Sequence, residues 1–126
     1  MSSLRTVVLA LAAVFAAHGS AQATGSIDMI FAGCVGRMSA EMEHAWLMGE
    51  DSDHAADRRA VFLSLLEATM ERDRARDLLA HRIAAKMSQA MLLTLSSFAE
   101  DESRAIRAQE LSRMEVAACG RLLLDS

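Results

Sequence analysis

Copper binding is the chemistry that the methionines and histidines of this sequence first suggest. The chain has nine methionines among 126 residues, and thioether sulfurs are soft ligands that suit copper(I). Glu41, His44 and Met48 are spaced so that a helix would present them side by side on an exposed face. This trio is a candidate metal site, and periplasmic copper binding through Met and His is the alternative function that it supports.

A place in the protein interior is the competing interpretation for most of the methionines. Met fills irregular cores well because its unbranched side chain adapts to the space available. Helical spacing directs five of them into apolar stripes, and we expect these five to be core residues: Met38, Met42, Met87, Met91 and Met114.

Motifs for other chemistry are missing from the sequence. No two histidines have the His-x-x-x-His spacing of a zinc site, and no Cys-x-x-Cys-His segment could attach haem. A nucleophile elbow and a glycine-rich phosphate loop are also absent. The sequence therefore predicts a protein that is not an enzyme and that needs no cofactor.

One acidic residue interrupts an apolar stripe. Glu115 lies between Leu111 and Ala118 on the inner face expected for the last helix. We expect an edge position there, with an ion pair to Arg107 or Arg104.

The first 23 residues have the pattern of a signal peptide. Arg5 precedes an apolar run over residues 7–17, and Ala21 and Ala23 are the small residues that a signal peptidase accepts. Cleavage after Ala23 would leave residues 24–126 as a single helical domain in the periplasm or outside the cell. The apolar run is shorter than the roughly 20 residues that span a bilayer, so we expect no transmembrane segment in the mature chain.

A lipoprotein signal is a second interpretation of the export segment. Residues 31–34 read Phe-Ala-Gly-Cys, which resembles the end of a lipoprotein cleavage site. The polar residues 18–28 separate this cysteine from the apolar run, whereas a lipidated cysteine directly follows such a run. The ordinary signal peptide is therefore favoured.

Both cysteines remain in the mature chain. Exported proteins meet an oxidising environment, so Cys34 and Cys119 predict one disulfide. Closing a loop of about 85 residues would stabilise the fold by about 4.5 kcal/mol in the chain-entropy model.

The charge of the mature chain disfavours two kinds of partner. Arg5 is the only charged residue in the leader, so 12 basic and 17 acidic residues remain, a net charge of −5. Nucleic acids and anionic membrane surfaces bind clustered Lys and Arg, which this composition does not offer. We expect no nucleic-acid binding.

Periodicity and composition predict an all-α protein. Proline is absent, and apolar residues recur at helical spacing over four stretches. The first stripe consists of Ile27, Phe31, Cys34, Val35, Met38, Met42, Ala45 and Trp46, and the second of Ala55, Phe62, Leu65, Leu66 and Thr69. The third consists of Ala80, Ile83, Ala84, Met87, Met91, Thr94 and Phe98, and the last of Ala108, Leu111, Met114, Ala118, Cys119 and Leu122.

Residues 53–100 could form one helix or two, because they contain neither Gly nor Pro. One straight helix would be about 70 Å long, which exceeds the span of a domain of this size. A break at the charged residues 71–77 is therefore favoured. Only an even number of helices brings Cys34 and Cys119 to the same end, so the sequence predicts a small four-helix up-down bundle with a disulfide joining the first and last helices.

The function that these features favour is binding rather than catalysis. We expect a non-enzymatic envelope protein that binds a protein or peptide partner, with a chaperone-like role as one version. Methionine-lined grooves can adapt to varied apolar ligands, which is the basis for this expectation.

Overall fold

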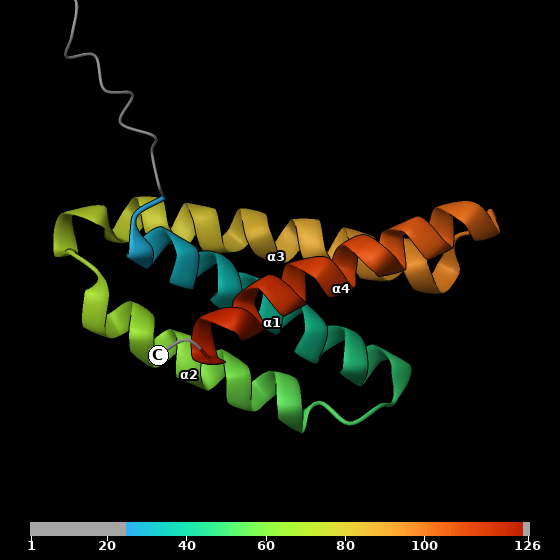
Figure 1. Ribbon diagram of the computed structural model, residues 1–126, viewed down its shortest axis with the longest axis horizontal. Coiled ribbons are helices and arrows are strands. Elements are labelled where there is room, and N and C mark those ends of the chain that lie inside the picture. The colour runs from blue at the N-terminus through green and yellow to red at the C-terminus, as the bar shows by residue number, and fades with distance from the viewer. Residues whose placement is uncertain (1–24, 125–126) are drawn as a thin grey trace, which may run out of the picture.

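Four antiparallel helices make up the described part of the chain, as predicted. The computed structural model describes residues 25–124, so the predicted signal peptide lies outside the described residues. The helices are α1 (Ile27–Met48), α2 (Asp53–Thr69), α3 (Ala75–Phe98) and α4 (Glu102–Leu124), with a short 3₁₀ helix η1 (Arg72–Arg74) before α3. Successive helices run in opposite directions, which gives an up-down bundle (Figure 1).

The helix ends follow local sequence signals. Gly49 ends α1 in the left-handed conformation with φ 69°, which glycine adopts without a steric penalty. The predicted break in the middle of the chain is confirmed, because Met70 has an extended backbone and α3 starts at Ala75. Asp101 caps α4 by accepting hydrogen bonds from the backbone N–H groups of Ser103 and Arg104.

Helix α1 is the central helix, packed against α2 on one side and α3 on the other. A small residue on α1, Gly36, permits α3 to pack this closely against it. A Cβ atom added at Gly36 would collide with the backbone carbonyl of Arg82 and lie 2.9 Å from the backbone nitrogen of Lys86. The backbones of α1 and α3 therefore approach closely only because residue 36 has no side chain.

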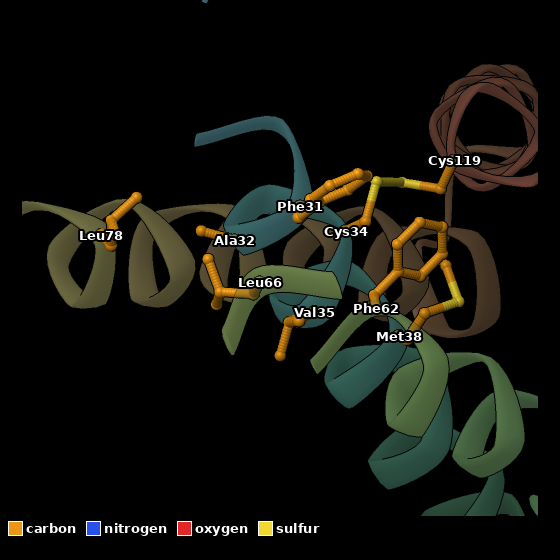
Figure 2. Close-up of a cluster of buried hydrophobic side chains, with 9 residues drawn as sticks. All are labelled: Phe31, Ala32, Cys34, Val35, Met38, Phe62, Leu66, Leu78 and Cys119. Atoms are coloured by element: carbon orange, nitrogen blue, oxygen red, sulfur yellow. A yellow bond between two sulfur atoms is a disulfide. The ribbon is translucent and has the colours of Figure 1, made fainter. Parts of the chain in front are cut away.

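The hydrophobic core lies between the first half of α1 and its two neighbours. Figure 2 shows Phe31 of α1 and Phe62 of α2 beside the disulfide, and their ring centroids are 6.3 Å apart. Val35, Met38 and Phe62 are at most 1 % exposed. The inward face predicted for α1 ends before Trp46, which is exposed and donates a hydrogen bond from Nε1 to Ser52 Oγ.

The predicted disulfide joins α1 to α4. Cys34 and Cys119 have Cα atoms 5.7 Å apart, and their sulfurs are bonded (Figure 2). A lipid on Cys34 would need a thioether to the same sulfur, so the disulfide and the lipoprotein interpretation exclude each other.

A charged contact fixes the start of α1 to the segment before α3. Asp28 is buried, and Arg74 Nη1 donates to both of its carboxylate oxygens at 2.8 and 2.9 Å. A hydrogen bond from Ser26 lowers the pKa of the Asp28 carboxyl below its ordinary value of 3.8; the Met29 backbone N–H and Arg74 lower it further, against the opposing effect of burial.

No helix within residues 25–124 is both long enough and apolar enough to cross a membrane.

Candidate binding groove

An apolar groove opens between the start of α1 and the end of α4. Its volume is about 510 Å³, within the usual size range of ligand sites. Met29 and Ile30 of α1 form one wall, Ala118 and Leu122 of α4 form the other, and the Cys34–Cys119 disulfide lies between them. We call this the disulfide groove.

The course of α4 explains why the groove exists. This helix packs along α3 and contacts α1 much less, so it crosses the bundle obliquely (Figure 1). The disulfide holds its C-terminal part to α1 at Cys34, and space remains where the two helices diverge. The covalent link that the sequence predicts therefore also shapes the groove.

Three polar side chains border the groove: Arg37, His81 and Glu115. Arg37 Nη2 and Glu115 Oε2 form an ion pair at 2.7 Å. The prediction that Glu115 pairs with Arg107 or Arg104 is therefore wrong, because the oblique course of α4 brings Glu115 to α1 instead. A Cβ at Gly33 would lie 2.9 Å from Arg37 Nη1 and 3.2 Å from His81 Nε2, so this glycine makes room for both side chains.

The apolar stripe predicted for α3 faces outward, contrary to expectation. Ile83, Met87, Met91 and Phe98 are between 52 and 65 % exposed, and Ala80, Ala84 and Thr94 are exposed as well. The buried residues of α3 lie on the opposite side: Leu78, Ala85, Gln89 and Leu93. We call the exposed set from Ala80 to Phe98 the outer face of α3.

Close packing explains which side of α3 is buried. Ala85 and the backbone of Arg82 lie against Gly36, so α1 approaches α3 most closely on the side that carries Ala85. The larger side chains of the other row cannot fit such a contact. Similarly, Leu111, Met114 and Ala118 of the stripe predicted for α4 are exposed, while Ala108 and Cys119 are buried.

The methionines divide into two groups. Met38 is fully buried and Met42 partly buried, in line with the predicted core role. Met87, Met91 and Met114 are about 65 % exposed, so the prediction that they are core residues is wrong. Flexible, polarisable side chains at the surface are typical of binding surfaces that adapt to their partner.

The three residues of the candidate metal site, Glu41, His44 and Met48, have separate surroundings in the structure. Glu41 Oε1 accepts a hydrogen bond from Gln89 Nε2 at 2.6 Å, and the His44 ring is hydrogen-bonded to Ser97 Oγ at 3.0 Å. Met48 is exposed at the last residue of α1. Among residues 25–124, no three His, Cys, Asp or Glu side chains form a group that could hold a metal ion. A copper site that includes a methionine stays a prediction.

A buried polar cluster around Gln89 was not predicted from the sequence. Gln89 is 1 % exposed, and its Nε2 donates to Glu41 Oε1 and to Ser112 Oγ, which links α1, α3 and α4. Its Oε1 has no hydrogen-bond partner in the described structure. The four-residue spacing of Gln89 from Ala85 and from Leu93 is the signal that could have placed it on the inner face.

Comparison with known proteins gives no relative from which a function could be inferred: no family model, no curated protein and no solved structure matches this chain.

Proposed function

We propose that this chain is an exported, non-enzymatic protein that binds an amphipathic helical segment of a partner protein in the disulfide groove. The observation that carries the proposal is the groove itself, an apolar site of about 510 Å³ between two diverging helices. Binding of an apolar helix face between two helices is a common mode of peptide recognition.

The chemistry of the groove supports a helical peptide as its occupant. Met29, Ile30 and Leu122 offer apolar contacts to side chains spaced three and four residues apart. Arg37 and Glu115 at the border offer a donor and an acceptor to the polar side of the same segment. Apolar contacts give affinity there, and the charged pair favours one orientation of the peptide.

Export is the second part of the proposal. A disulfide persists in the periplasm and outside the cell, whereas cytoplasmic thiols are kept reduced. Together with the signal-peptide pattern, the disulfide supports cleavage after Ala23 and a periplasmic or secreted protein. Mass spectrometry of the protein recovered from the envelope fraction and the medium tests this: we expect an N-terminus at Thr24 and no free thiol, and an uncleaved, reduced chain would contradict it.

Filling the groove tests the binding proposal. A fluorescein-labelled peptide with leucine at every third or fourth position, and serine and alanine elsewhere, is titrated with the purified protein in a polarisation assay. We expect Ala118→Trp to weaken binding by about tenfold or more, because an indole in the wall displaces an apolar side chain of the peptide.

A matched control distinguishes the groove from other apolar surfaces. Ala117→Trp adds the same side chain at the neighbouring exposed residue of α4, which does not line the groove, and binding should be unchanged. Equal binding by Ala118→Trp and the unmodified protein would reject the groove as the site, and so would an absence of binding at millimolar protein.

A further inference from the structure

The outer face of α3 is an apolar surface that stays largely exposed in the described chain, with only its end at Phe98 in an edge-to-face ring contact with His44 of α1. It runs from Ala80 to Phe98 on α3, the helix along the upper edge of the molecule in Figure 1, and faces away from the buried residues Ala85, Gln89 and Leu93. No charged residue occurs between Lys86 and Glu100. For a chain with a net negative charge, this is a surface on which a second copy can approach without repulsion between like charges.

The residues of the outer face are arranged symmetrically about the level of Gln89. Met87 and Met91 are equally far from that level, and so are Ala84 and Thr94, and Ala80 and Phe98. When two α3 helices pack antiparallel, Met87 therefore faces Met91 of the second copy. Each small alanine likewise faces a larger side chain, an arrangement that fills space along a helix pair.

Charge complementarity supports the antiparallel arrangement. Arg76 lies one helical turn before Ala80 in the same row, is exposed, and takes part in none of the ion pairs among residues 25–124. The turn after α3 carries three consecutive acidic residues, 100–102, all exposed. In the antiparallel pair, Arg76 of each copy lies at the level of this acidic turn of the other.

We propose that the protein forms a two-fold symmetric homodimer through the outer face of α3, with the two helices antiparallel and Met87 of one copy against Met91 of the other. A two-fold axis makes such an interface self-complementary, as in most homodimers. The disulfide groove is a different surface, so the homodimer can be tested independently of peptide binding.

Sedimentation equilibrium over a range of protein concentrations tests the proposal. We expect a reversible monomer–dimer equilibrium for the unmodified protein. Met87→Glu places an unpaired carboxylate in each half of the symmetric interface, which should raise the dimer Kd by about tenfold per carboxylate and therefore about 100-fold. Because Met87 is 64 % exposed in the single chain, the variant should keep its helical circular dichroism and its disulfide.

Met114→Glu is the matched control, since Met114 is 65 % exposed on α4 and lies outside the outer face of α3. This variant should dimerise like the unmodified protein. The register is tested by mixing Met87→Glu with Met91→Lys: the antiparallel pairing sets the new glutamate of one copy against the new lysine of the other, so the mixture should dimerise more tightly than either variant alone.

Three results would overturn the proposal. The first is an unmodified protein that stays monomeric at several hundred micromolar. This holds also if the outer face of α3 instead binds phosphatidylcholine vesicles or the leucine peptide. The second is equal loss of dimer in Met87→Glu and Met114→Glu. The third is a mixture of the two α3 variants that associates no better than its components.

Discussion

The first half of α1 and the outer face of α3 are both apolar at helical spacing, yet one is buried and the other is exposed. Ten residues of α1 between Asp28 and Ala40 are buried, on all sides of the helix. On α3, Ile83, Met87, Met91 and Phe98 are exposed, while the buried residues are Leu78, Ala85, Gln89 and Leu93. The difference shows that close contact at small residues, here Gly36 against Ala85, helps to select the face that packs, in addition to polarity.

A glycine at the closest contact is what α1 has and the outer face of α3 lacks. Gly36 lets the backbone of α3 approach, and Ala32 and Ala40 are also buried on α1. A row of Ile, Met and Phe side chains would keep a neighbouring helix farther away. The four predictions below test this contrast, from the largest expected loss of stability to the smallest.

Removing the disulfide should have the largest effect. We expect Cys34→Ala combined with Cys119→Ala to lower the free energy of unfolding by about 4.5 kcal/mol, because the unfolded chain regains the freedom of an 85-residue loop. Urea unfolding followed by circular dichroism measures the loss. A change below about 1 kcal/mol would show that α4 is held by packing on α3 rather than by its link to α1.

Shortening a methionine should lower the stability much more in the core part of α1 than on the outer face of α3. Met38→Ala should cost about 2–5 kcal/mol because it leaves a cavity in the core, whereas Met87→Ala should stay within about 0.5 kcal/mol. Both are measured by urea unfolding at concentrations where the protein is monomeric. Similar losses for the two variants would mean that the outer face of α3 is packed within the single chain.

Adding a methyl group to α1 should test the close approach of α3. Gly36→Ala should destabilise the protein by about 1–3 kcal/mol, since its Cβ meets the backbone of Arg82. Gly33→Ala on the same helix is the matched control: its Cβ meets only the ends of the Arg37 and His81 side chains, which can move, and alanine favours helix. Thermal unfolding should rank Gly33→Ala above Gly36→Ala, and the reverse order would contradict the packing described for α1.

Acid should weaken the contact that starts α1. The pKa of Asp28 is lowered in the folded chain, so its contribution to stability is complete above the ordinary value of 3.8 and is lost as the pH falls through the lowered value. The free energy of unfolding of Asp28→Asn should therefore decrease less between pH 5 and pH 2 than that of the unmodified protein. The difference should be roughly what the protonation of one carboxylate contributes. Parallel pH profiles of the two proteins in urea would count against this role of Asp28.

Much of the fold can be predicted from the sequence, because its signals are local. The helices, the left-handed Gly49, the break before α3 and the disulfide between the first and last helices all follow from residue types and spacing. Each depends on a short stretch of chain or, for Cys34 and Cys119, on a parity argument about antiparallel helices.

The orientation of α3 could not be predicted in this way. That helix has one row with Ala85 and Leu93 and another with Ile83 and Met87, and periodicity alone favours the more hydrophobic row. The buried row is decided by the fit to Gly36, a contact between residues distant in the sequence. The disulfide groove escaped prediction for the same reason, since it depends on the oblique course of α4.

Methionine oxidation by dilute peroxide tests the contrast between α1 and α3 most directly, because all the reporters are natural residues. Protein diluted to a monomeric concentration is sampled over time, and peptide mass spectrometry follows the sulfoxide at each methionine. We expect Met87, Met91 and Met114 to be oxidised rapidly while Met38 stays intact until the protein unfolds. Oxidation of Met38 as fast as Met87, or protection of Met87 and Met91 in the monomer, would contradict the exposed outer face of α3.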